Sequence, residues 1–380
     1  MSSTAGRRNA TGVRGFLRAE IAIFVSLGTV AILLWAGSRL LENVVQPVWL
    51  TLILIWLFGT VLWSAISVAR HADCLAIRCG EPYGTLILTL AAISIEVMMI
   101  SAAMLHQANN PTLARDTMFA VIMIALNGLV GLSLLLGGLR HKEQQYNLQG
   151  TNSYLNAILC LAVLGLILPD FTTSAQGPNF SRAQEMFLII VSLVLYAIFL
   201  AMQTARYRKH FMETQLAAAE SGAEHHEVDM GSTPYHAVML VVYLATVVVL
   251  AEKFAIPLDR SIEQFGVPQA FGGAIVAALV LAPEAMSAVR AAVSNHMQRS
   301  INLLLGSVLA TIGLTIPAVL MIGLFTGRPV TLGMQGGEFP LLLLTLAVCV
   351  VTFASGRTNV LQGCIHLLLF AVFLLLIFCP

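Results

Sequence analysis

Long, unbroken apolar runs are the feature of this sequence that most restricts its fold. Eleven of them approach or exceed the length of about 20 residues that a helix needs to cross a membrane. Of the 380 residues, 58% are hydrophobic and only 10% are charged, whereas soluble domains have about 45–50% apolar and about 25% charged residues. A soluble enzyme, a disordered protein and a nucleic-acid-binding protein are therefore excluded. A barrel would show short alternating strands instead, so we expect an all-α polytopic membrane protein.

The distribution of basic residues predicts how these spans are oriented. The eleven expected spans lie near residues 20–41, 48–69, 84–106, 117–139, 153–169, 185–205, 235–256, 270–289, 301–325, 339–355 and 359–378. With a cytoplasmic N-terminus, fourteen of the twenty Lys and Arg residues fall in cytoplasmic loops, as the positive-inside rule requires. We therefore expect a cytoplasmic N-terminus and a periplasmic C-terminus. The first run has no small-residue cleavage site after it, so we expect it to be retained as a span.

A long polar stretch between Tyr207 and Pro234 divides the chain. The expected organisation is a cytoplasmic N-terminal tail (1–19), an extra first transmembrane helix (20–47), a first five-helix repeat (48–206), an acidic His-containing cytoplasmic loop (207–234) and a second five-helix repeat (235–380). Because five is odd, the two repeats must have opposite orientations in the membrane. This inverted-repeat plan is typical of secondary transporters.

Two acidic residues, Glu96 and Glu284, lie in the middle of apolar runs, whereas almost every other acid lies in a loop or at a span end. A charge at mid-membrane costs at least about 2.5–3.5 kcal/mol on insertion scales, so such a residue usually faces a partner, a cavity or an ion. Each glutamate follows a glycine, Gly84 or Gly272, by twelve residues and lies in the second span of its half. We expect inverted halves to bring the two together near the midplane. The alternative is that each is a protonated glutamic acid bonded to a neighbouring helix.

A pair of close carboxylates would suit the exchange of a cation for protons. Pro283 removes one helical hydrogen bond and frees the carbonyl of Leu279, and such hard oxygen ligands suit Ca²⁺. Carboxylates that lie close together raise each other's proton affinity, so the empty site would hold protons that an entering cation displaces. One Ca²⁺ in place of two protons leaves the charge of the site unchanged. Mutually exclusive binding of this kind is what an antiporter needs.

Polar residues on the same or the following spans are candidate secondary ligands, namely Ser94, Asn127, Asn302, Ser307 and Thr311. Their alternative role is hydrogen bonding between helices, which is common for such residues in membranes. Asn127 and Thr311 follow Arg115 and Arg299, respectively, by twelve residues each. This matched spacing is expected of two repeats.

Two polar regions outside the apolar runs are candidates for contact with ions on the cytoplasmic side. The first could form a cytoplasmic entrance, or a solvated loop with local ion pairs, and contains His71, Asp73 and Glu81. The second is a possible regulatory loop that could sense Ca²⁺ weakly, and contains Glu224, His225, His226, Glu227 and Asp229. It lacks the EF-hand pattern, so we favour a solvated acidic linker.

Four long stretches of the sequence resemble a known transporter family. They are VARHADCLAIRCGEPYGTLILTLAAISIEV (68–97), LARDTMFAVIMIALNGLVGLSLLLGGLRH (113–141), LAPEAMSAVRAAVSNHMQRSINLLLGSVLATIGLTIPAV (281–319) and SGRTNVLQGCIHL (355–367). They resemble the bacterial Cha-type calcium–proton antiporters, which also exchange sodium and potassium, in the calcium/cation antiporter superfamily. The resemblance implies a sodium/calcium exchanger-like fold in the bacterial inner membrane and alternating access. It also implies export of Ca²⁺, and of Na⁺ and K⁺, for protons at Glu96 and Glu284.

The sequence departs from the wider superfamily at one point. Many members have Gly-Asn shortly before the repeat glutamate, but Ala92-Ile93 precedes Ser94 here and Leu281-Ala282 precedes Pro283. Without those Asn ligands, the selectivity for Ca²⁺ over Na⁺ and K⁺ is left open. A monovalent-selective Na⁺(K⁺)/proton antiporter is therefore the second hypothesis, and a cation channel is the third.

The remaining expectations concern chemistry and partners. An intramembrane enzyme is disfavoured because the chain has no HExxH motif and no apparent His/carboxylate cluster within a span. We expect no cofactor, since Ca²⁺, Na⁺, K⁺ and protons would be cargo. The expected partners are the lipid bilayer, inorganic cations and protons, with a second copy of the chain as a further candidate.

Overall fold

The computed structural model describes residues 20–37, 46–79, 83–106, 112–211, 232–327, 329–334 and 336–379, and most of these are helical. Within these ranges the only β pairing is an isolated bridge between Gln145 and Arg357. In the described part of the chain, eight helices are long and apolar enough to cross a membrane, and three shorter apolar helices accompany them. The all-α architecture expected from the apolar runs is confirmed.

The helices follow the order of the expected spans. The first half of the chain contains α2 (Ile21–Gly37), α3 (Pro47–Cys79), α4 (Tyr83–His106), α5 (Leu113–Met123), η2 (Ile124–Leu129), α6 (Val130–His141), α7 (Leu148–Ala162), η3 (Val163–Ile167), η4 (Leu168–Phe171), α8 (Arg182–Ala201), η5 (Met202–Arg206) and η6 (Arg208–Phe211). The second half contains α10 (Thr233–Phe265), α11 (Gln269–Val293), α12 (Met297–Ala310), η7 (Thr311–Thr315), α13 (Ile316–Thr326), α14 (Glu338–Thr352) and α15 (Val360–Phe378). The turns η2 and η7 are π-helical and interrupt the third span of each half, and such interruptions often occur at functional sites.

The first helix of each half is longer than its apolar run. α3 and α10 both have 33 residues, whereas the runs predict spans of 48–69 and 235–256. α3 continues because Arg70 to Cys79 contains neither glycine nor proline and includes good helix formers such as Ala72 and Leu75. α10 continues through Pro257 and ends at Gly266, whose φ of 62° is left-handed. Asp73, which we expected in a loop, therefore lies on a helix.

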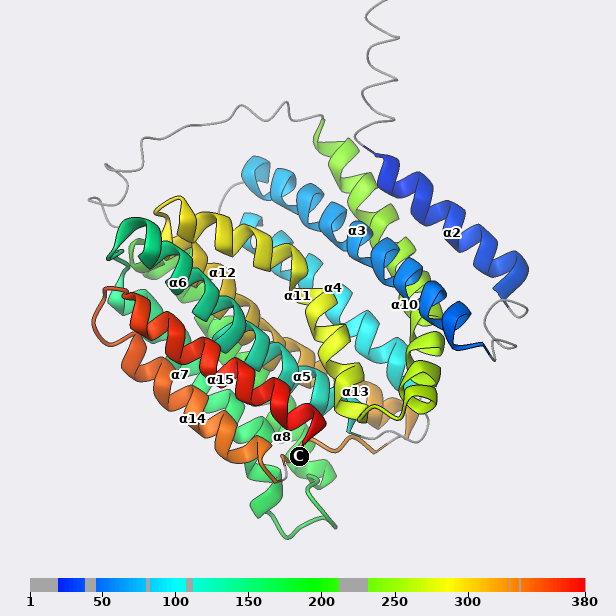
Figure 1. Ribbon diagram of the computed structural model, residues 1–380. Coiled ribbons are helices and arrows are strands. Elements are labelled where there is room, and N and C mark those ends of the chain that lie inside the picture. The colour runs from blue at the N-terminus through cyan, green and yellow to red at the C-terminus, as the bar shows by residue number, and fades with distance from the viewer. Residues whose placement is uncertain are drawn as a thin grey trace, which may run out of the picture.

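The buried apolar side chains form two separate clusters. One, which we call the core unit, includes residues of α5, α7, α12 and α15. The other, which we call the three-helix unit, is built mainly on α2, α3 and α10, which lie together at one side of the molecule (Figure 1). Two helices besides α10 contribute to both clusters, because α4 places Ile93 in the core unit and Ile95 in the three-helix unit, and α11 does the same with Leu281 and Val280. The two helices that carry Glu96 and Glu284 therefore lie between the two units.

A glycine allows α11 to approach α5 directly. A Cβ added at Gly273 would lie 2.9 Å from the carbonyl carbon of Asp116 and 2.9 Å from the amide nitrogen of Thr117. Small residues permit such close backbone contact between helices in membranes. The contact holds the N-terminal half of the helix that carries Glu284 against the core unit.

This contact generates a stability prediction. We expect Gly273→Ala to destabilise the protein by about 1–3 kcal/mol, because the added methyl group has only backbone atoms to displace. Gly59→Ala is the matched control, since nothing lies within 4 Å of its added Cβ and alanine favours a helix. Thermal unfolding in detergent should give a lower midpoint for Gly273→Ala only. Equal midpoints for the two variants would show that the helix contact is not tight.

Candidate cation and proton site

A cavity of about 520 Å³ lies among helices of both halves of the chain. α3, α4 and α8 of the first half and α11 and α12 of the second half contribute to its wall. Its polar lining residues are Asp73, Thr89, Glu96, Gln203, Glu284, Ser287, Gln298, Arg299, Asn302 and Ser307, together with Tyr154 and Tyr196. The two glutamates singled out in the sequence thus face one common space.

Glu96 lies on α4 and is held from the other half of the chain. Its side chain is almost completely buried, and its Oε2 accepts a hydrogen bond from the Thr311 hydroxyl at 2.9 Å. Thr315, four residues further along η7, faces the same carboxylate. Oε1 of Glu96 is buried, and among the described residues it has no hydrogen-bond partner. One oxygen of this carboxylate is therefore fixed, and the other is available to a proton or a cation.

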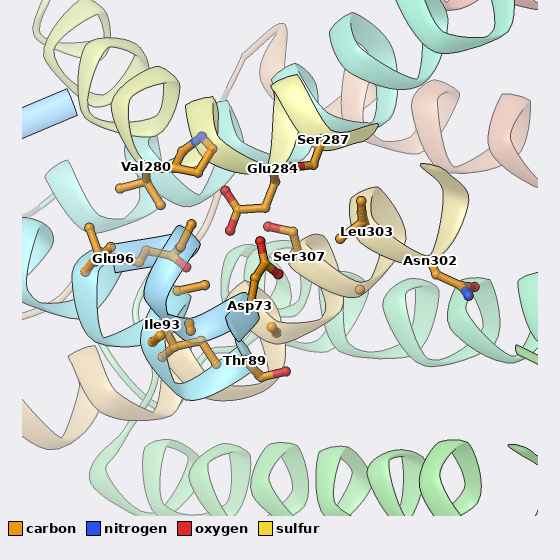
Figure 2. Close-up of a pocket in the computed structure, with 18 of the residues that line it drawn as sticks. Asp73, Thr89, Ile93, Glu96, Val280, Glu284, Ser287, Asn302, Leu303 and Ser307 are labelled. Atoms are coloured by element: carbon orange, nitrogen blue, oxygen red, sulfur yellow. The ribbon is translucent and has the colours of Figure 1, made fainter. Parts of the chain in front are cut away.

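Glu284 lies on α11 directly after Pro283, which also lines the cavity. Its Oε2 is buried and likewise lacks a hydrogen-bond partner within the part of the chain that is described. Figure 2 shows its carboxylate pointing toward Asp73 and Ser307, which come from α3 and α12. Pro283 and Glu284 thus lie together on one wall of the cavity.

The electrostatics of the cavity restrict what it can contain. A buried carboxylate oxygen without a donor is unfavourable as a bare anion. Glu96 and Glu284 are near enough to repel each other, and Glu284 and Asp73 also repel. These acids need a proton or a positive ion to balance their charge. The cavity is therefore suited chemically to binding protons and cations in competition.

Asp73 and Arg299 line the cavity and are exposed to solvent. They lie near the end of α3 and the start of α12, so this is the end at which the cavity meets solvent. Arg299 is close enough to interact electrostatically with Asp73. The predicted entrance residue Asp73 is thus placed at the cavity mouth, together with an arginine that the sequence analysis did not assign to the site.

Two of the predicted secondary ligands use their polar groups elsewhere. Asn302 lines the cavity, but its Oδ1 accepts from Gln298 at 2.8 Å and its Nδ2 donates to the carbonyl of Phe211 at 2.7 Å. The hydroxyl of Ser94 donates to the carbonyl of Leu90 within its own helix at 2.6 Å. In this conformation the polar groups of both side chains are occupied by these bonds. Ser307 and Thr311 lie nearer to the two glutamates.

Asn127 is outside the cavity. It is completely buried, and its Nδ2 donates to Thr345 at 2.8 Å while its Oδ1 lies 3.2 Å from Nδ1 of His366. Nε2 of His366 lies 3.0 Å from the Thr352 hydroxyl. Asn127 therefore joins η2 to α14 and α15. Asn127 follows Arg115 by the same number of residues as Thr311 follows Arg299. This spacing does not show which side of its helix Asn127 occupies.

His71 lies in a second buried polar cluster, on the side of α3 that faces α2 and α10. At the centre of this cluster is Glu20, whose oxygens accept from Arg70 at 2.9 Å, from Tyr235 at 2.6 Å and from Tyr243 at 2.9 Å. His71 lies 3.4 Å from Glu20, and its Nδ1 lies 2.9 Å from Nδ1 of His236. The cluster joins α2, α3 and α10.

Six of the predicted residues lie outside the described part of the chain. They are Glu81 of the expected entrance and Glu224, His225, His226, Glu227 and Asp229 of the possible regulatory loop.

The Glu20 cluster gives a stability prediction. The buried carboxylate of Glu20 accepts hydrogen bonds from Arg70, Tyr235 and Tyr243, and a hydrogen bond to a charged group contributes about 1.5–3 kcal/mol. We expect Glu20→Gln to reduce stability by about 1–3 kcal/mol at pH 7, because the amide lacks the charge that these donors face. Thermal unfolding in detergent should give a lower midpoint for Glu20→Gln than for wild type; an unchanged midpoint would contradict it.

Comparison with known proteins shows which family the sequence is similar to. The model of the family described as sodium/calcium exchanger protein matches residues 49–205 and 235–379. The sodium-potassium/proton antiporter ChaA of Escherichia coli K12 is 40% identical over 357 residues, which is 94% of this chain and 95% of that protein. The Ca²⁺/H⁺ antiporter of Aphanothece halophytica is 26% identical over 69% of this chain and 73% of its own length.

Solved structures show the same fold. The structure of native YfkE superposes with a TM-score of 0.73 at 16% sequence identity and covers 94% of this chain and 100% of that chain. This likeness confirms the exchanger-like fold that the sequence predicted.

Proposed function

The chain belongs to the sodium/calcium exchanger protein family, and on that premise we propose that this multi-pass secondary antiporter exports Ca²⁺ from the cytoplasm in exchange for protons. The observation that carries the proposal is a pair of buried oxygens, one on Glu96 and one on Glu284, that have no hydrogen-bond partner among the described residues and lie beside the same cavity. Because a bare anion is unfavourable there, each state of the transporter must carry either protons or a cation. Competition for the same oxygens couples the two fluxes.

The sequence of events follows from the arrangement of the cavity. A cytoplasmic cation would enter past Asp73, reach Glu284 and Glu96, and displace the protons that these carboxylates hold. Replacement of two protons by one Ca²⁺ keeps the charge of the site constant, so the loaded and unloaded forms have similar costs of burial. Both forms could then pass through the closed state that alternating access requires.

The ligands available are hard oxygens. Glu96 and Glu284 supply carboxylate oxygens, and Ser307 can supply a hydroxyl. The carbonyl of Leu279, which Pro283 leaves without its usual amide donor, belongs to a buried residue outside the cavity lining. Ca²⁺ accepts six to eight oxygen ligands in flexible geometry, so water would complete its shell.

A monovalent-selective antiporter is the second candidate function. It is favoured by the 40% identity to the sodium-potassium/proton antiporter of Escherichia coli and by the lack of asparagine ligands before Glu96 and Glu284. Arg299 at the cavity mouth also reduces the negative potential that attracts divalent ions. Competition between Ca²⁺, Na⁺ and K⁺ in one transport assay separates the two functions.

The central prediction concerns the two glutamates. We expect Glu96→Gln and Glu284→Gln each to abolish Ca²⁺-driven proton release in everted membrane vesicles, followed with a pH-sensitive dye, because an amide cannot exchange a proton for a cation. Glu143→Gln is the matched control, since this acid is exposed and pairs only with the exposed Arg357 at 3.6 Å. It should transport like wild type. Retained exchange in either buried variant, at normal protein abundance, would refute the assigned site.

The hydrogen bond from Thr311 to Glu96 gives a graded prediction. Thr311→Val removes a donor to the ionised carboxylate, a bond worth about 1.5–3 kcal/mol when one partner is charged. We expect the KM for the cation to rise about tenfold or more in the same vesicles, with exchange retained. Thr326→Val is the control, because this exposed threonine bonds only to its own helix. An unchanged KM in Thr311→Val would show that the hydrogen bond does not contribute to the site.

A further inference from the structure

Two segments from opposite halves of the chain must be held at a fixed distance for the site to form. α4 carries Glu96, and the π-helical turn η7 carries Thr311 and Thr315, which both face the carboxylate of Glu96. The hydroxyl of Thr311 donates to Oε2 of Glu96 at 2.9 Å. Beyond about 3.5 Å no such hydrogen bond remains. A small displacement of η7 relative to α4 is therefore enough to break it.

A tyrosine from a third helix lies directly against η7. Tyr196 of α8 is buried, and a Cβ added at Gly313 would lie 2.9 Å from Cδ2, 3.2 Å from Cβ and 3.3 Å from Cγ of this tyrosine. A methyl group at this place would overlap the ring, so glycine is the residue that leaves room for it. Gly313 is the middle residue of η7, two positions from Thr311 and two from Thr315. The ring thus meets η7 midway between the two threonines that face Glu96.

The other end of Tyr196 lies toward α4. Its hydroxyl faces the side chain of Thr89, which is seven residues before Glu96 on the same helix (Figure 2). A spacing of seven is about two helical turns, so Thr89 and Glu96 are on one side of α4. Both residues line the cavity, as Tyr196 does. One side chain from α8 therefore contacts η7 with its ring and approaches α4 with its hydroxyl.

The backbone of η7 departs from regular α-helical bonding. It is a π-helical turn of five residues, and such turns are rare and occur mostly singly within α-helices. Pro317 follows the turn and has no N–H group, so the carbonyl of Gly313 lacks the donor that an α-helix would supply. The positions of Thr311 and Thr315 therefore depend on packing against η7 as well as on helical hydrogen bonds.

We propose that Tyr196 and Gly313 are positioning residues for the cation site. The Tyr196 ring, seated on Gly313, fixes the middle of η7, and its hydroxyl fixes α4. Together these contacts set the distance between Glu96 and the hydroxyl groups of Thr311 and Thr315. Those hydroxyl groups favour the ionised carboxylate that a cation binds, so the contact sets the affinity of the site for the cation. The inference rests on the proposed exchange function and adds the contact that assembles its site.

The first test adds a methyl group at the contact. We expect Gly313→Ala to raise the KM for the cation at least about fivefold in everted vesicles, because a displaced η7 weakens a hydrogen bond to a charged group. The maximal rate should stay near that of wild type. Gly28→Ala on α2 is the matched control, since nothing lies within 4 Å of its added Cβ, and it should change neither value. A lower maximal rate with an unchanged KM would assign Gly313 a purely structural role and overturn the proposal.

Further substitutions test whether Tyr196 is the partner. Tyr196→Ala should raise the KM by itself, but Gly313→Ala should then add nothing, because the methyl group has room once the ring is removed. Independent sites would multiply their effects on the KM, so a double variant with the product of the two effects would contradict the contact. Tyr196→Phe keeps the ring and should raise the KM by a smaller factor, to which Thr89→Val adds nothing. An additional rise with Thr89→Val would show that the two side chains act separately.

A measurement without transport separates this inference from the proposed function. Thermal unfolding in detergent measures the interaction between Thr311 and Glu96 as a double-mutant cycle with Thr311→Val and Glu96→Gln. We expect the two substitutions to be coupled in wild type and additive in the Gly313→Ala background, because the displaced turn no longer reaches the carboxylate. Equal coupling in both backgrounds would overturn the positioning role even if Glu96→Gln abolishes exchange. Loss of the coupling would support it whether or not the protein exchanges Ca²⁺ for protons.

Discussion

Buried carboxylate oxygens that lack a donor are the constraint on which the rest of this structure depends. Glu96 is bonded on one oxygen by Thr311 of the opposite half, and both Glu96 and Glu284 present a second oxygen without a partner in the described part of the chain. A charge in such a place is tolerated only with a counter-ion or a proton. These carboxylates therefore need a bound proton or cation at all times. In the proposed exchange, protons and the cation neutralise them in turn.

The architecture places these carboxylates between the two apolar units. α4 and α11, which carry the glutamates, contribute side chains to both the core unit and the three-helix unit. The buried cluster around Glu20 ties α2, α3 and α10 together, so these three helices form one packed unit beside the site.

Much of this could be predicted from the sequence, because membrane helices are encoded in long apolar runs and because isolated acids stand out within them. The apolar runs predict the helices, and the same pattern singles out Glu96 and Glu284, which line one cavity in the structure. Hydropathy could not show that α3 continues beyond the apolar run, so Asp73 was expected in a loop. The spacing in the sequence matched Asn127 to Thr311 but could not show which side of its helix faces the cavity. Asn127 donates a hydrogen bond to Thr345 and lies outside the cavity. The Glu20 cluster depends on contacts between residues about 50 and 220 positions apart, which no local pattern reveals.

Proton release on cation binding tests the central claim most directly. Purified protein in detergent and weak buffer would be titrated with Ca²⁺, and in parallel with Na⁺ and K⁺, while bound cation and released protons are both measured. The account predicts release of up to two protons for each Ca²⁺ bound near neutral pH, and no release from a variant that lacks both glutamate carboxylates. Saturable Ca²⁺ binding without proton release would show that cation and protons do not share these oxygens.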